Sequence, residues 1–166
     1  MQQPKEFVNQ LRKENQALFE ASKMNVKAYF EGDLPEEEMV DHFIGRMVNE
    51  RMNMTEISAQ IAKVDDNADP KELELLTRQA ADEAKHYRMV KEVIEHIKGE
   101  EINVAEALEA ERQADTAKGA TLLEKYDAEN DEAVLAAYQL VAEGRAEAVW
   151  NQMADTIKDE FISSRY

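Results

Sequence analysis

A glutamate and a histidine stand three positions apart in a segment with helical periodicity. Residues three apart lie on the same face of a helix, so Glu83 and His86 can reach one point in space. Carboxylate and imidazole are ligands that divalent transition metals accept. In such a pair the glutamate can bridge two ions while the histidine binds one of them. The other two histidines, His42 and His96, have no glutamate three positions earlier.

A second glutamate interrupts an apolar stripe in the preceding expected helix. The stripe includes Phe43, Met47, Met54 and Ile57, and Glu50 lies three residues after Met47 and four before Met54. This spacing predicts a carboxylate at a core position.

Glu83 and His86 also fall on an apolar stripe, since Glu83 lies seven residues from both Leu76 and Val90. These residues also lie at about the same distance from the interhelical loop as Glu50 does. At 1.5 Å per residue, Glu50 lies roughly 22 Å before the interhelical loop, and Glu83 and His86 lie roughly 20 and 24 Å after it. In an antiparallel pair of helices the three side chains would meet at one level.

A third glutamate is indicated by a weak internal repeat. The run Met47 to Glu50 aligns without gaps with Leu140 to Glu143, and each helix is expected to continue for about four turns beyond its glutamate. Glu143 lies three residues after Leu140 and seven before Trp150, which again predicts a core position.

Three buried carboxylates must be neutralised in some way, because an unpaired charge in a dry interior costs several kcal/mol. Protonation could neutralise them in part, and so could the neighbouring Arg51, Lys85 or Arg145. A divalent metal ion, or a pair of ions, would do so more completely.

The sequence predicts an all-α fold in a single domain spanning residues 1–166. Few glycines and prolines occur, 5 and 3 respectively, and strong helix formers dominate. Pro35, Asp69 with Pro70, Asn103 and Asn130 mark helix starts, and Gly32 and Gly99 mark helix ends. The expected elements are an N-terminal accessory helix (1–32), a first ligand hairpin (35–98), a crossover helix (103–128) and a third ligand helix (130–163).

Composition excludes several classes of function. The net charge of −16 argues against nucleic acid or an anionic membrane as partner, and metal ions suit it better. The absence of cysteine excludes thiolate metal sites and thiol nucleophiles. No apolar stretch approaches the ~20 residues of a membrane span. These features predict a cytoplasmic protein.

The run Asp82-Glu83-Ala84-Lys85-His86 resembles the D-E-x-x-H run of ferritin-like di-metal carboxylate proteins. The resemblance covers residues 36–162 and implies an antiparallel helical bundle in which two helices each give a glutamate and two each give a Glu-x-x-His pair. Glu50, Glu83, His86 and Glu143 would then be metal ligands. The implied cofactor is two iron ions, or iron with manganese.

One part of the family pattern is missing, because no second Glu-x-x-His follows Glu143. By the spacing from Glu50 to Glu83 it would fall near position 176, so we expect the chain to continue into another helix or a second chain to supply these ligands. A competing alignment pairs the last two predicted helices and uses Glu111 and Glu147, which lie about equally far from Asn130. These two residues are the alternate ligands.

The resemblance implies an oxidoreductase that activates dioxygen or peroxide at a non-haem di-metal centre and acts on a small organic molecule. Two alternatives stay open, namely iron oxidation and storage as in ferritin, and a metal-free helical adaptor. A homodimer is one assembly that the sequence leaves open.

Overall fold

The computed structural model describes residues 3–32, 34–118 and 132–165, and every regular element in these ranges is a helix. The predicted all-α fold is therefore confirmed for the described part of the chain. The contacts divide the chain into two compact units, residues 35–114 and residues 1–34 with 115–166. The ferritin-like arrangement of a single domain stays a prediction.

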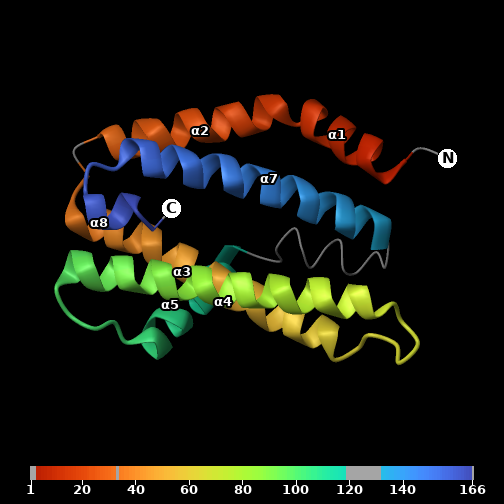
Figure 1. The fold of residues 1–166 in the computed structure, drawn as a ribbon. Helices are drawn as coiled ribbons and strands as arrows, with labels where there is room; N and C mark the ends of the chain where they lie inside the picture. Colours follow the sequence, from red (N-terminus) through yellow and green to blue (C-terminus); the bar gives the residue numbers. More distant parts are fainter. Residues whose placement is uncertain (1–2, 33, 119–131, 166) are drawn as a thin grey trace. The chain divides into compact units, whose positions relative to one another are not determined.

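The unit of residues 35–114 is built on an antiparallel helical hairpin of α3 (Glu36–Ile61) and α4 (Pro70–Lys98), which pack along each other (Figure 1). Three glutamates in the first turn of α3 suit the positive end of the helix dipole. Asp69 caps α4 by accepting a hydrogen bond from the Lys71 N–H at 2.9 Å. Gly99 ends α4 in the left-handed conformation, with φ 67°. The predicted bounds of the first ligand hairpin are close to those observed.

Helix α5 (Val104–Lys118) follows a short loop that is attached to α4. Asn103 caps α5 by accepting from the Glu106 N–H at 3.4 Å, as predicted. The Glu95 carboxylate accepts from the Ile102 N–H at 3.2 Å and from the Lys91 ammonium, which fixes the loop against α4. The rest of the predicted crossover helix, residues 119–128, lies outside the described residues.

The other unit contains α1 (Pro4–Glu14), α2 (Gln16–Glu31), α7 (Glu132–Thr156) and α8 (Glu160–Ser163). Helix α7 contacts the other three, most extensively α2 (Figure 1). The predicted N-terminal accessory helix is divided at Asn15. Its side-chain amide donates to the Leu11 carbonyl oxygen at 2.9 Å, an alternative to continuous helical hydrogen bonding.

The predicted third ligand helix, 130–163, is also divided. Helix α7 ends at Thr156, and Asp159 begins α8 by accepting hydrogen bonds from the Phe161 and Ile162 N–H groups. A capping aspartate favours a new helix start over helix continuation, which explains the break. The expected capping residue Asn130 lies outside the described residues.

The two mid-helix glycines provide a matched pair of stability predictions. A Cβ atom on Gly45 would meet no heavy atom within 4 Å, so Gly45→Ala should stabilise the protein by about 1 kcal/mol through helix propensity alone. A Cβ atom on Gly144 would lie 3.1 Å from Cζ of Phe19 on α2, so Gly144→Ala should gain less or destabilise. Urea unfolding of both variants measures the difference, and equal gains would contradict the close approach of α7 to α2.

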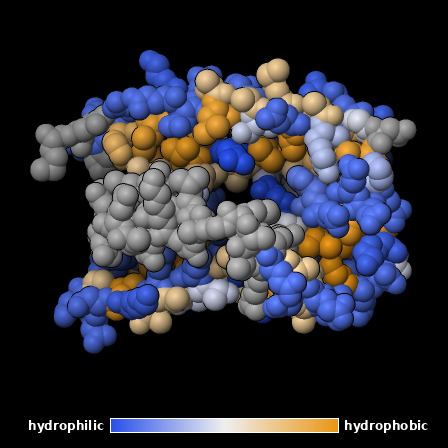
Figure 2. Space-filling view, turned by 180° about the vertical axis from the view of Figure 1, so that it is seen from behind, coloured by the Kyte–Doolittle hydropathy of each residue, from blue (hydrophilic) through white to orange (hydrophobic). Residues whose placement is uncertain are grey.

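On the face drawn in Figure 2, the coloured surface is mostly hydrophilic and is interrupted by hydrophobic areas. The large hydrophobic side chains that are exposed among the described residues are Phe7, Leu18, Met24, Met52, Leu73 and Leu75. None of the described helices has both the length and the apolar character needed to cross a bilayer.

Candidate metal centre

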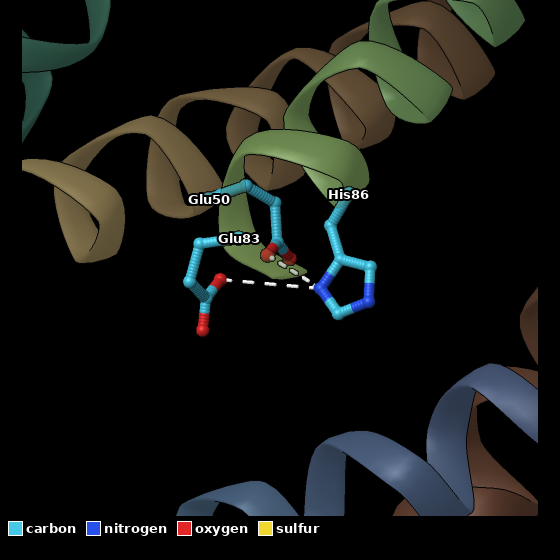
Figure 3. Close-up of side chains that lie close together, drawn as sticks. All are labelled: Glu50, Glu83 and His86. Atoms are coloured by element: carbon cyan, nitrogen blue, oxygen red, sulfur yellow. Dashed lines mark ion pairs between the residues drawn. The ribbon is translucent and has the colours of Figure 1, made fainter. Parts of the chain in front are cut away.

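Glu50 of α3 and Glu83 and His86 of α4 come together in the hairpin (Figure 3). One potential ligand atom from each residue lies within 4.8 Å of the other two. His86 Nδ1 is 3.5 Å from Oε2 of Glu50 and 4.0 Å from Oε2 of Glu83. The prediction that these three residues meet at one level of an antiparallel pair is confirmed.

The apolar residues around the ligands explain why the ligands face inward. In α3, Phe43 and Met47 are fully buried, and Glu50 follows Met47 by three residues on the same face. In α4, Val90 and Val93 are fully buried, and Glu83 precedes Val90 by two helical turns. Burial of these apolar side chains fixes the rotation of both helices and so aims the carboxylates at each other.

The three candidate ligands differ in their access to solvent. Glu50 and Glu83 are each only 6% exposed, whereas the His86 side chain is 37% exposed. Two carboxylates at this depth are uncommon in a helical hairpin, because charged groups are rarely buried without a partner. The half-exposed imidazole leaves one side of the cluster open to an incoming ion.

The imidazole presents its Nδ1 atom to both carboxylates, and Nε2 points away from them (Figure 3). Nδ1 is therefore the nitrogen that could bind a metal ion next to Glu50 and Glu83. A ligating imidazole is neutral, so Nε2 would keep its hydrogen and Nδ1 would give its lone pair to the ion.

The charge of Glu50 is favoured despite its burial. Burial raises the pKa of Glu50, but side-chain hydrogen bonds with His86 and Glu83 and the positive charge of Arg46 outweigh it, so the pKa lies below its ordinary value. An ionised Glu50 is the form that binds a cation.

The spacing of the donor atoms suits a single metal ion or one ion of a pair. Oxygen and nitrogen ligands lie about 2.1 Å from a divalent transition metal, so two ligands of one ion are about 3.0–4.2 Å apart. The two distances from His86 Nδ1, 3.5 and 4.0 Å, fall within this range. Small side-chain rotations would suffice to close the cluster around an ion.

The other predicted ligands are not part of this cluster. Glu143 and Glu147 are exposed residues of α7, in the other unit, and the burial expected for Glu143 from the repeat is not observed. Gly144 faces α2 through Phe19, and the adjacent residue of a helix points about 100° away. A ligand role for Glu143 stays a prediction. The same holds for Glu147, and the side chain of Glu111 lies outside the described residues.

Arg46 is the functional neighbour that the sequence pattern did not single out. Its charge acts on Glu50, one helical turn further along α3. The cations considered from the sequence, Arg51, Lys85 and Arg145, are all exposed. The i, i+4 spacing between Arg46 and Glu50 places both residues on one face of the helix, and this spacing could have identified Arg46 from the sequence.

Arg46 also affects His42, which precedes it by one turn. Burial, and then the charge of Arg46, lower the pKa of His42 to about 4. The unfolded chain protonates His42 near pH 6.5 and the folded protein resists this, so this contribution to stability is complete above pH 6.5 and is lost as the pH falls toward 4. We expect a loss of about 1 kcal/mol between pH 7 and pH 5, after allowance for solvent screening.

Urea unfolding at pH 7 and pH 5 measures this loss. His42→Gln should reduce the pH dependence, and His96→Gln, a change at an exposed histidine of α4, is the matched control. Equal pH dependence of wild type and His42→Gln would contradict the role of His42.

A separate hollow of about 430 Å³ lies where the α4–α5 loop meets α3 and α5. Ile44, Ile102, Ala107 and Ala110 form its apolar part, and none of the three candidate ligands lines it. The metal cluster and this hollow are therefore different features of the same unit.

No protein-family model, curated protein or solved structure matches this chain. The resemblance to ferritin-like di-metal proteins rests on the run Asp82 to His86 and on the position of Glu50 opposite it. The observed geometry shows that the three residues lie close together. Membership of the family stays a prediction.

Proposed function

We propose that the protein is a non-haem metalloprotein that holds iron, or iron with manganese, at Glu50, Glu83 and His86 and uses it to oxidise a small organic molecule with dioxygen or peroxide. The observation that supports the proposal is the meeting of two buried carboxylates and an imidazole nitrogen, from two helices, within 4.8 Å. This donor set is typical of carboxylate-rich redox metal centres.

A metal ion accounts for the cluster better than internal pairing does. Two buried carboxylates require two positive charges or extensive hydrogen bonding, and an imidazole and the nearby charge of Arg46 supply only part of this. A divalent ion neutralises both carboxylates at once and accepts their remaining lone pairs. The overall net charge of −16 also favours the approach of cations.

The identity of the metal follows from the donor atoms. Oxygen and nitrogen ligands without any thiolate suit iron and manganese, and three protein ligands leave coordination positions for water, dioxygen or further ligands. A bound iron centre would supply electrons to dioxygen or peroxide. Glu83 can bridge two ions while His86 binds one of them, so the cluster is suited to one half of a di-metal centre.

The rest of the ligand set is also part of the proposal. Glu143 is the proposed fourth ligand, and a second Glu-x-x-His pair would complete the ligand set. Only the hairpin cluster has observed geometry. The experiment therefore tests the ligands of the hairpin.

The experiment loads metal-free protein with Fe²⁺ without oxygen, measures iron per chain, and then follows oxygen consumption and the absorbance of oxidised iron. We expect one to two ions per chain and rapid oxygen uptake in the wild type. Glu83→Gln should lose both, and Glu74→Gln, at an exposed position of α4, should lose neither.

Other outcomes identify the alternatives. A large multi-subunit assembly that accumulates far more than two iron ions per chain would replace the oxidase with iron storage. Protein that retains neither iron nor manganese would overturn the proposal and leave a metal-free helical adaptor.

A further inference from the structure

The hairpin of α3 and α4 is packed very unevenly along its length. We define the base half as residues 36–50 and 83–98, and the tip half as residues 51–82, which include the interhelical loop. The base half contains nine buried residues: Val40, Phe43, Met47, Val48, Glu50, Glu83, Val90, Val93 and Ile94. The tip half contains one, Ile57.

Large apolar side chains are present in the tip half but are left exposed. Met52 is 43% exposed, Leu73 is 38% exposed and Leu75 is 55% exposed. Since burial of apolar surface is the main source of stability, the tip half gains little from packing. Its two helices are therefore expected to separate or unwind more easily than those of the base half.

Local hydrogen bonding in α3 further weakens the tip half. The Thr55 hydroxyl donates to the Arg51 carbonyl oxygen at 3.0 Å, and the Ser58 hydroxyl donates to the Met54 carbonyl oxygen at 2.7 Å. Such bonds to the residue four positions earlier slightly destabilise and bend a helix.

The metal cluster lies at the boundary between the two halves. Glu50 is the last residue of the base half in α3, and Glu83 is its first residue in α4. At the same level the Arg51 guanidinium lies over the Tyr87 ring, 5.7 Å from its centre, so a second contact joins the two helices here. An ion bound by Glu50, Glu83 and His86 would join α3 to α4 at the level beyond which only Ile57 of the tip half is buried.

We infer that metal binding orders the tip half of the hairpin, so that the ion replaces the hydrophobic packing that residues 51–82 lack. This inference rests on the proposed metal site. The ion would then join α3 to α4 at one end of the tip half, and the interhelical loop joins them at the other end. The two helices of the tip half could therefore separate only after release of the ion.

Hydrogen exchange of the full chain, measured by mass spectrometry with and without Mn²⁺, tests the inference. If opening requires metal release, an ion concentration of about 100 times its dissociation constant slows exchange in residues 51–61 and 70–82 by about 100-fold. Exchange in the base half should change much less, because its packing does not depend on the ion. Glu83→Gln should show no such protection, and Glu74→Gln should behave like the wild type.

A titration of Mn²⁺ on the same samples distinguishes the two ways in which the idea can fail. Protein that binds Mn²⁺ but shows equal protection in both halves, or protection of the base half alone, overturns the ordering of the tip half and leaves the metal site intact. Protein that binds no Mn²⁺ and no Fe²⁺ overturns both.

Discussion

Glu83→Gln is expected to weaken Fe²⁺ or Mn²⁺ binding by roughly 100-fold or more. Changes to groups that merely support a metal ligand cost 10–100-fold in affinity, and loss of a direct anionic ligand should cost at least as much. Glu83 is 6% exposed and lies 4.0 Å from His86 Nδ1, so no solvent-exposed carboxylate can readily take its place. Isothermal titration calorimetry of metal-free protein measures the change.

The same experiment includes two controls. Glutamine has almost the size of glutamate, so the metal-free variant should fold, and circular dichroism should show an unchanged helical content. Glu74→Gln removes one negative charge from an exposed position of the same helix and should leave the affinity within about twofold. If Glu83→Gln and Glu74→Gln bind metal equally well, the metal site at Glu50, Glu83 and His86 is wrong.

Saturating metal should raise the thermal stability of the wild-type protein strongly. An ion that binds only the folded state adds about 2.7 kcal/mol at 100 times its dissociation constant. For a chain of this length, roughly 2–4 °C in Tm accompanies each kcal/mol, so we expect a rise of about 5–11 °C. Calorimetry over a series of Mn²⁺ concentrations should show a Tm that increases with the logarithm of the concentration.

We expect the stabilisation to come from the proposed metal site and not from the rest of the chain's acidic surface. Glu83→Gln should lose most of the metal-dependent rise, while Mg²⁺, which prefers all-oxygen and largely hydrated sites, should produce little. A similar rise with Mg²⁺, or one that survives in Glu83→Gln, would indicate non-specific binding to the acidic surface instead of a site in the hairpin.

The hairpin ligands could be predicted from the sequence because their positions depend on local rules. Asp69, Pro70 and Gly99 fix where α4 begins and ends, and the short loop makes α3 and α4 antiparallel neighbours. The constant rise of a helix then places Glu50 opposite Glu83. The alternation of apolar residues fixes which face is buried, and both carboxylates lie on it.

The helix breaks were harder to predict because they depend on competing local hydrogen bonds of similar free energy. Asn15 and Asp159 are each compatible with a helix interior or a helix end, and only the folded chain determines which hydrogen bonds form. The position of Glu143 was uncertain for a different reason. In an Ala-rich helix apolar periodicity defines the buried face poorly, and the rotation of α7 is determined by the contact between Gly144 and Phe19.

The sequence by itself therefore determined the helices of the hairpin, their register and the chemistry of the three residues that meet there. Tertiary structure alone decided the depth of burial of these carboxylates, the influence of Arg46 on Glu50 and the uneven packing on either side of the cluster. The reason is that rise and periodicity are properties of each helix, whereas burial and the local electrostatic field depend on which surfaces pack together.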